Sequence, residues 1–153
     1  MAKAKAKTKT KRGVKVTVKP VTQISVKLTD KPGELANIAE ALAAADVSID
    51  GVGVTHSGGK TVIDNLVVDN VPKAKKVLSS RGKRIATSEI LKFYCADDRP
   101  GVIAAIARKL ANGRVNIENA FHASTGRGEK AVFYVAVRPS QFKKALKLAK
   151  QIR

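Results

Sequence analysis

Each half of this sequence contains one turn whose residue types could bind a small anion. Residues 29–35 read TDKPGEL and residues 97–103 read DDRPGVI. In each turn a proline ends the preceding strand and sets the backbone for a helix. The glycine that follows leaves the first helical amides uncovered by a Cβ, so that a carboxylate could approach them. We expect Asp30 and Asp98 to accept hydrogen bonds from these first-turn amides.

The two turns belong to an internal repeat. Pro32 and Pro100 lie 68 positions apart, and the same spacing superimposes the apolar positions that follow each proline. These positions are Leu35, Ile38, Ala39 and Leu42 in the first copy, and Ile103, Ile106, Ala107 and Leu110 in the second. For one isolated turn, a plain strand-to-helix connection is the simpler interpretation, but duplication at a fixed interval favours two related units. Helices are therefore predicted over 32–45 and 101–111, each burying this face.

Alternating apolar residues predict the strands that position the turns. The alternation covers 14–19 and 24–28, with a kink or an edge position at Pro20, and returns over 47–55, 61–68, 91–95, 115–124 and 131–137. Further helices are predicted from Asn70 to Leu78, with Gly82 as the C-terminal cap, and after Ser140 as an N-terminal cap. The alternation of 91–95 is one position out of step with 24–28, which predicts a turn one residue longer at 97–98.

The order strand-helix-strand-strand-helix, repeated together with the D-x-P-G turn, resembles the ACT domain. The similarity rests on residues 30–35 and 98–103, on VSI at 47–49 and VNI at 115–117 at the family's spacing, and on DNLVVD at 64–69. It implies an α+β chain of two tandem ferredoxin-like βαββαβ units, with antiparallel sheets and helices on one face. The units are expected at 21–89 and 90–153, after a disordered basic tail at 1–12 and a further strand at 13–20.

The strand at 13–20 compensates for one that the second unit lacks. The chain stops directly after the last predicted helix, whereas residues 83–89 provide a closing strand for the first unit. Arg12-Gly13 precedes residues 14–19 as Arg81-Gly82 precedes residues 83–89. By this symmetry the N-terminal strand should cross over and complete the second unit, since an unpaired edge would otherwise be exposed.

The resemblance also implies a ligand site between ACT units, lined by the turn and early helix of one unit and the second strand of its neighbour. The residues that match are Asp30, Gly33, Glu34, Leu35, Ser48 and Ile49 in the first copy, and Asp98, Gly101, Val102, Ile103, Asn116 and Ile117 in the second. The copies differ, because Asn116 both donates and accepts hydrogen bonds where Ser48 has only a hydroxyl. Two chemically equal sites are therefore not expected.

This resemblance implies a stand-alone regulatory, allosteric protein that binds an amino acid, acts as a homo-oligomer or on a partner enzyme, and has no catalytic residues. No motif pairs His56 or His122 with Cys95, the only cysteine, so we interpret Cys95 as a core residue. His122, on a predicted strand, remains a candidate to touch the ligand. No metal ligands at short spacing and no cofactor motif are present.

Composition leaves two other functions open. The formal net charge of +18 and the lysines of residues 1–12 are compatible with weak nucleic-acid contact through this tail, or with a merely solubilising tail. Residues 127–134, RGEKAVFY, resemble part of an RNA-binding strand motif, but aromatic residues are only 4% of the chain. A structural subunit of a partner enzyme is the third possibility. Without an apolar run of about 18 residues or a signal peptide, a cytoplasmic location without membrane contact is expected.

Overall fold

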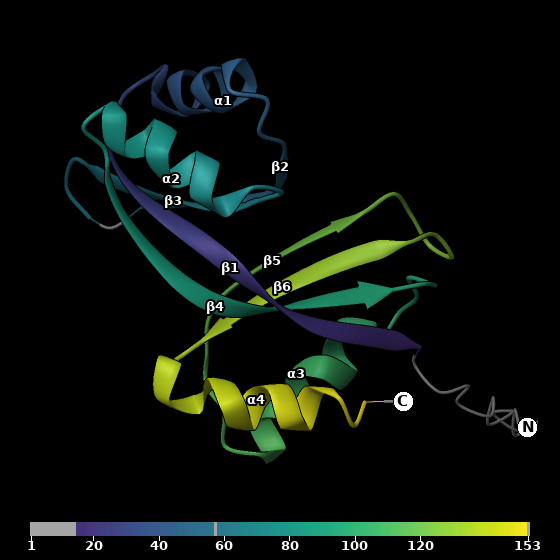
Figure 1. The fold of residues 1–153 in the computed structure, drawn as a ribbon. Coiled ribbons are helices and arrows are strands. Elements are labelled where there is room, and N and C mark those ends of the chain that lie inside the picture. Colours follow the sequence, from purple (N-terminus) through teal and green to yellow (C-terminus); the bar gives the residue numbers. More distant parts are fainter. Residues whose placement is uncertain (1–14, 57, 153) are drawn as a thin grey trace, which may run out of the picture.

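The computed structural model describes residues 15–56 and 58–152 (Figure 1). Within these ranges the chain forms six strands, four α-helices and one short 3₁₀ helix. In chain order they are β1 (Val16–Thr29), α1 (Glu34–Ala44), β2 (Ile49–His56), β3 (Thr61–Val68), α2 (Val71–Ser80), β4 (Arg84–Cys95), α3 (Val102–Asn112), β5 (Ile117–Ser124), β6 (Ala131–Val137), η1 (Pro139–Gln141) and α4 (Phe142–Ala149). None of the helices in the described ranges is long and apolar enough to cross a membrane.

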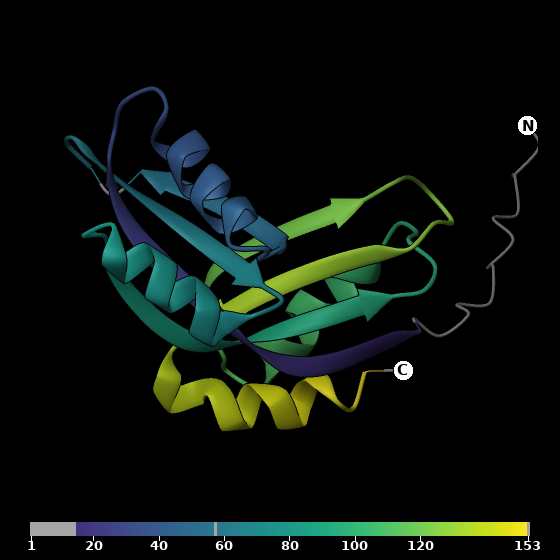
Figure 2. The same cartoon turned by 45° about the horizontal axis from the view of Figure 1, so that its top comes forward.

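The strands form one antiparallel sheet with a palindromic order, β2-β3-β1-β4-β6-β5. Reversing the order exchanges each strand of the first half with its repeat in the second half. The two halves are therefore related by a pseudo-twofold axis between β1 and β4. Helices α1 and α2 lie over one end of the sheet and α3 and α4 over the other (Figure 2). The α+β fold with two ferredoxin-like units is confirmed, with their sheets joined into one.

The long strands β1 and β4 each serve both halves. The N-terminal part of β1, from Val16 to Lys19, pairs with β4 from Lys92 to Cys95, which belongs to the sheet of the second half. The N-terminal part of β4 pairs with the part of β1 that also contacts β3. The predicted crossover of the N-terminal strand is confirmed from residue 16 onward. Residues 1–14, which include the predicted tail and the start of this strand, lie outside the described ranges.

Pro20 lies inside β1 without interrupting it. Pro20 pairs with Leu91 of β4, while β3 joins the other side of β1 only from Gln23 onward. The missing N–H of the proline therefore costs no ladder hydrogen bond to a second neighbour. The sequence predicted either a kink or an edge position at Pro20. The strand continues through Pro20 without ending, and the proline lies where β1 has a neighbour on one side.

One face of the sheet carries the core of each half. Ile24, Val26 and Leu28 of β1 pack with Ile38 and Leu42 of α1 and with α2. In the second half Leu91, Phe93 and Cys95 take the places of the three β1 residues, under α3 and α4. The turn after Cys95 has one more residue than the turn after Leu28, which restores the facing and confirms the predicted longer turn.

The predicted helix faces need one correction. Leu35 and Ile103 were expected in the core, but their exposed fractions are 41% and 39%. On α3 the buried residues are Val102, Ile106 and Leu110, at intervals of four, so Ile103 lies about 100° around the helix from this line. Exposure of both repeat-equivalent residues leaves an apolar side chain beside each turn.

The helix ends agree with the sequence in part. Asn70 caps α2 by accepting a hydrogen bond from the N–H of Lys73 at 3.1 Å, and Gly82 follows the helix with φ +68°. Ser140, however, lies in the 3₁₀ turn and does not cap α4, which starts after Gln141 without a side-chain cap. The side chain of Gln141 instead donates to the carbonyl of Arg114 at 3.0 Å and accepts from the N–H of Asn116 at 3.3 Å.

The face of the sheet away from the helices folds upon itself. Tyr134 of β6 stacks on Phe121 of β5 with ring centroids 4.7 Å apart, and its hydroxyl donates to the carbonyl of Asp50 at 3.3 Å. A Cβ at Gly51 would lie 2.9 Å from both rings, so only glycine permits this approach of β2 to β5. The two halves thus pack against each other through their open sheet faces.

Candidate functional site

The two turns adopt the same backbone conformation. Gly33 and Gly101 are the N-cap residues of α1 and α3, with φ of +92° and +103°. A side chain at this φ is strained, which explains the glycine in both copies. Neither helix has a side-chain cap, so the prediction that Asp30 and Asp98 cap the first-turn amides is wrong.

Asp30 and Asp98 instead fasten the turns to the hairpins. The carboxylate of Asp30 lies 3.3 Å from Nδ1 of His56 at the end of β2, and the carboxylate of Asp98 accepts a hydrogen bond from the Ser124 hydroxyl at the end of β5. The N–H groups of Asp30 and Asp98 donate to the carbonyls of Lys60 and Glu129, at 2.8 and 2.7 Å. These bonds hold each turn at the ends of its neighbouring strands.

In the second half the turn borders an open cavity of about 390 Å³, hereafter the α3 cavity. Its walls come from the turn, the first turn of α3, β5 and the loop after β5. The lining residues are Asp98, Arg99, Pro100, Gly101, Ile103, Ala104, His122, Gly126 and Arg127. The lining combines apolar residues with two arginines and with Asp98, and Nε of Arg99 lies 4.0 Å from the carboxylate of Asp97. Arginine next to apolar side chains is suited to a small molecule that carries a carboxylate and an apolar part.

Three of the predicted site residues of the second half, Asp98, Gly101 and Ile103, line the α3 cavity together. Val102 does not, because its side chain is buried in the core. Asn116 and Ile117 lie at the start of β5, whereas the cavity adjoins the end of this strand at His122. The direction of β5 therefore separates these two residues from the turn of their own unit.

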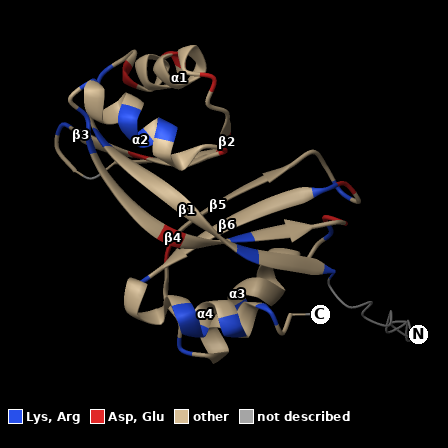
Figure 3. Cartoon of the chain, in the orientation of Figure 1, with Lys and Arg blue, Asp and Glu red and all other residues tan. Residues whose placement is uncertain are grey.

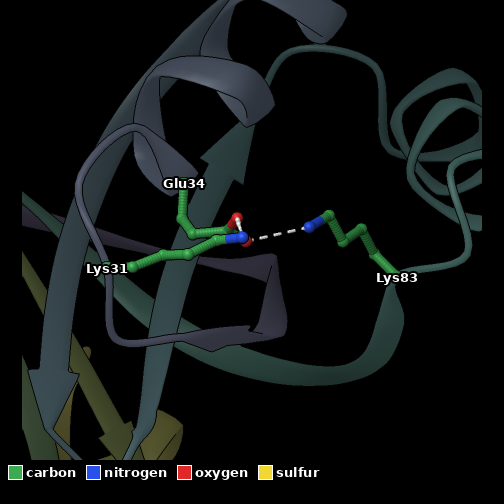
Figure 4. A network of polar contacts seen from close by, with 3 residues as sticks. All are labelled: Lys31, Glu34 and Lys83. Carbon is green, nitrogen blue, oxygen red and sulfur yellow. Dashed lines mark hydrogen bonds and ion pairs between the residues drawn. The ribbon is translucent and has the colours of Figure 1, made fainter.

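The first half presents different chemistry at the equivalent turn. Glu34 forms ion pairs with Lys83 at 3.0 Å and with Lys31 at 3.5 Å (Figure 4). The hydrogen bond from Lys83 lowers the pKa of Glu34 below its ordinary value of 4.5, against an opposing effect of burial. Glu34 also borders a cavity of about 300 Å³ whose other lining residues include Lys27, Lys60 and Arg84.

The remaining predicted residues of the first half are scattered. Gly33 and Leu35 are exposed on α1, while Ile49 packs against the core of the first half. The N–H of Ser48 donates to the carboxylate of Asp69 at 3.0 Å.

Asp64 of β3 is a buried carboxyl group in the first half, with a side chain that is 1% exposed. Burial, followed by the charge of Glu34, raises the pKa of Asp64.

Cys95 is buried in the core of the second half, as interpreted from the sequence, and burial raises the pKa of its thiol. In the described ranges, no group of three or more His, Cys, Asp or Glu side chains is placed to hold a metal ion.

Five lining residues were not among the predicted site residues, although His122 was named as a candidate: Arg99, Pro100, Ala104, Gly126 and Arg127. One signal was present in the sequence. Asp30 and His56 are separated by the same interval as Asp98 and Ser124, so the contact between turn and strand end repeats with the period of the two halves. This period places the end of β5, and the loop that follows it, beside the second turn.

The comparison with protein families identifies one segment. Residues 90–153 match the model of the ACT domain. No curated protein sequence matches the chain at a significant level.

Solved structures share the architecture over nearly the whole chain. A protein of Bacteroides thetaiotaomicron has a TM-score of 0.76 with 22% identity, covering 88% of this chain and 89% of that one. The regulatory subunit of aspartate kinase from Thermus thermophilus, without ligand, has a TM-score of 0.67 with 19% identity and coverages of 92% and 99%. The corresponding subunit from Thermus flavus has a TM-score of 0.64 with 20% identity and coverages of 92% and 98%. At these identities the likeness concerns the fold.

Proposed function

We propose that this protein, whose residues 90–153 form a unit of the ACT domain family, is a regulatory protein that binds an amino acid in the α3 cavity. The observation that carries the proposal is the convergence of the second D-x-P-G turn, Ile103 and two arginines around one open cavity. A guanidinium of Arg99 or Arg127 would bind the carboxylate of the amino acid, and Ile103 would contact its apolar part. Two of the structures with the same fold are regulatory subunits of aspartate kinase, which supports a regulatory role.

We further propose that a second copy of the chain completes the site. Ile103 and Leu35 are exposed in the single chain, and exposed apolar side chains of this size are suited to an interface. The second copy would supply the start of a neighbouring second strand, with Asn116 and Ile117 or with Ser48 and Ile49. The first-half turn, with Asp30, Gly33, Glu34 and Leu35, would form the corresponding second site, where the ion pairs of Glu34 leave different chemistry.

A thermal-shift screen against the amino acids tests ligand binding directly. A ligand at a hundred times its dissociation constant stabilises the folded state by about 2.7 kcal/mol, which is measurable for a small domain. Ala104→Trp should fill the α3 cavity and remove the response to the ligand. Ala111→Trp, at an exposed position of the same helix outside the cavity lining and away from both turns, is the matched control and should keep the response. Equal responses in both variants would place the ligand elsewhere.

The contribution of a second copy has its own test. Asn116→Ala should weaken binding by about 1–3 kcal/mol if this side chain contacts the ligand across the interface. Because Asn116 does not line the α3 cavity of its own chain, we expect the weakening together with a dimer in sedimentation experiments. Unchanged affinity in a monomeric protein would rule out the shared site.

The described residues do not favour RNA binding by the strand motif at 127–134. Phe133 is buried in the core of the second half, and Tyr134 is buried against Phe121 on the opposite face. Neither ring is available to stack on a base. Nucleic-acid contact through residues 1–12 stays a prediction. Removing the six positive charges of this segment, five lysines and Arg12, should lower DNA affinity and flatten its salt dependence.

A further inference from the structure

A second cavity, of about 400 Å³, lies on the face of the sheet away from the helices, and all six strands contribute to it. We call it the inter-half cavity. It is lined by Gln23 and Ser25 of β1, Thr55 of β2, Ile63 and Asn65 of β3, Ser88 of β4, Glu118 and Asn119 of β5, Ala136 and Val137 of β6, and Pro139. It shares no lining residue with the α3 cavity.

The wall of this cavity contains a buried polar network with one unused acceptor. The Gln23 amide donates to Oδ1 of Asn65 at 3.1 Å and to the Ser25 hydroxyl at 3.3 Å, and Ser25 donates to the same Asn65 oxygen at 2.9 Å. Gln23 and Asn65 are only 4% and 6% exposed. Oε1 of Gln23 is buried and accepts no hydrogen bond from the described residues. An acceptor buried without a donor destabilises the folded state, so its retention calls for an explanation.

The pseudo-twofold axis supplies an internal comparison for these polar positions. The pair Gln23 and Ser88 corresponds to the pair Ile90 and Val21, which also face each other across β1 and β4. In the same way Asn65 corresponds to Tyr134 and Ile63 to Val132, as the register of β3 and β6 shows. Val21, Ile90, Val132 and Tyr134 all belong to one packed apolar cluster.

The comparison shows what the fold itself requires. At one end of the open face, the repeat fills four of these positions with apolar side chains that pack together, and the halves meet there through Tyr134 and Asp50. The counterpart of Ser25 is Lys92, whose Nζ lies 5.4 Å from the centroid of the Tyr134 ring. At the other end, the same backbone positions carry Gln, Asn and Ser around a cavity. Packing of the two halves therefore does not depend on the polar residues, which points to a ligand for them.

The charge of the lining residues limits the chemical class of ligand that this cavity could bind. The chain contains 30 Lys and Arg residues, and none of those within the described ranges lines this cavity. Its one charged lining residue is Glu118, whose carboxylate lies 3.4 Å from Nε of Arg138. An anionic ligand would have no cationic lining residue to contact. A neutral or cationic group with N–H donors would satisfy Oε1 of Gln23 and benefit from Glu118.

We propose that the inter-half cavity binds a small molecule presenting N–H donors, as an ammonium or a carboxamide group. Gln23 accepts from the donor after a small movement of its amide toward the cavity, and the carboxamide of Asn119 and the hydroxyls of Thr55 and Ser88 provide the further polar contacts. Because strands of both halves line the cavity, a bound molecule would fix the halves relative to each other. This site is independent of the amino-acid site in the α3 cavity.

Nitrogen-15 NMR on the full chain tests the proposal with putrescine and propionamide as probes and acetate as the control anion. The ammonium probe, the carboxamide probe or both should shift the side-chain amide signals of Gln23, Asn65 and Asn119 in a saturable way, and acetate should not. The amide of Asn37, exposed on α1, should stay unchanged. Gly101, Ile103 and His122 report separately on the α3 cavity, so failure at one site is distinguishable from failure at the other.

Two variants provide the matched comparison. Gln23→Leu should abolish the saturable shifts. Asn119 is half-buried and lies outside the buried network, so Asn119→Ala should leave that network intact and raise the dissociation constant about tenfold. Asn37→Ala should leave binding unchanged. If Gln23→Leu fails to fold, Asn119→Ala decides alone. The absence of saturation up to about 50 mM of either probe, equal shifts with acetate, or unchanged binding in Asn119→Ala would overturn the proposal.

Discussion

At the scale of single residues, the two halves use corresponding positions for different chemistry. Glu34 is held between Lys31 and Lys83, whereas its counterpart Val102 is buried in the core. His56 and Ser124 correspond in position, and both contact the aspartate of their turn. The contact is therefore preserved while the chemical group changes, which indicates that the aspartates serve the turn structure in both halves.

The ion pair of Glu34 predicts a dependence of stability on pH. The hydrogen bond from Lys83 makes the folded-state pKa of Glu34 lower than its unfolded value. The stabilisation is therefore present above pH 4.5 and is lost as pH falls through the folded-state pKa. Denaturant unfolding of Glu34→Gln should show lower stability than the unmodified chain at pH 7, with the difference shrinking below pH 4.5. A constant difference across this range would assign the effect to packing.

The buried carboxyl of Asp64 predicts the opposite dependence. Its pKa is raised, first by burial and then by the charge of Glu34, and its Oδ2 has no hydrogen-bond partner in the described structure. The folded state therefore loses stability as pH rises from 3.8 through the folded-state pKa. Asp64→Asn should stabilise the protein at pH 7 by on the order of 1 kcal/mol, with no gain below pH 3.8. A destabilised variant at pH 7 would mean that the carboxylate has a favourable role.

At the scale of the elements, the repeat made the fold predictable. The helix faces and the strands β3 and β6 follow from periodicity, and the out-of-step alternation at 91–95 identified the longer second turn. The exposure of Leu35 and Ile103 did not follow, because a helix of 11 residues can bury either of two adjacent stripes. The inter-half cavity could not be predicted either, since its lining comes from six strands whose registers only the folded sheet fixes.

The residues that follow the C-terminal ends of α1 and α3 provide a prediction at this scale. Asp46 after α1 and Arg114 after α3 are the two non-glycine residues with positive φ in the described chain, at +55° and +57°. A left-handed conformation costs an ordinary residue roughly 1–2 kcal/mol, and glycine avoids this cost. Glycine also makes the unfolded chain more flexible, which offsets part of the gain in stability. Arg114→Gly should therefore raise the free energy of unfolding by about 0.5–1 kcal/mol, measured in urea. The bond from Gln141 to the carbonyl of residue 114 involves only backbone there and should persist.

At the scale of the whole molecule, the shared strands make the halves interdependent. The basic residues are spread over both halves (Figure 3). Each half has its own apolar core, and the described halves are connected through β1, β4 and the open faces of the sheet. The second half obtains one of its strands from Val16–Lys19, a segment that precedes the whole first half in sequence. Loss of such a strand should therefore be felt in the half that is remote in the sequence.

Truncation of the N-terminus tests this interdependence. Deleting residues 1–19 removes one of the two strand neighbours of Lys92–Cys95, which stay paired with β6. It also takes away Val16 and Val18, which pack against the core of the second half. Partial burial of two valines corresponds to about 2–3 kcal/mol, so the free energy of unfolding should fall by about this amount. Hydrogen exchange should accelerate in β4 and in Ala131–Val137, whereas β2 and β3 of the first half should change less. Deleting residues 1–12 alone leaves every described contact in place and is the control. Equal acceleration in both halves, or none in β6, would show that the crossing strand does not support the second half.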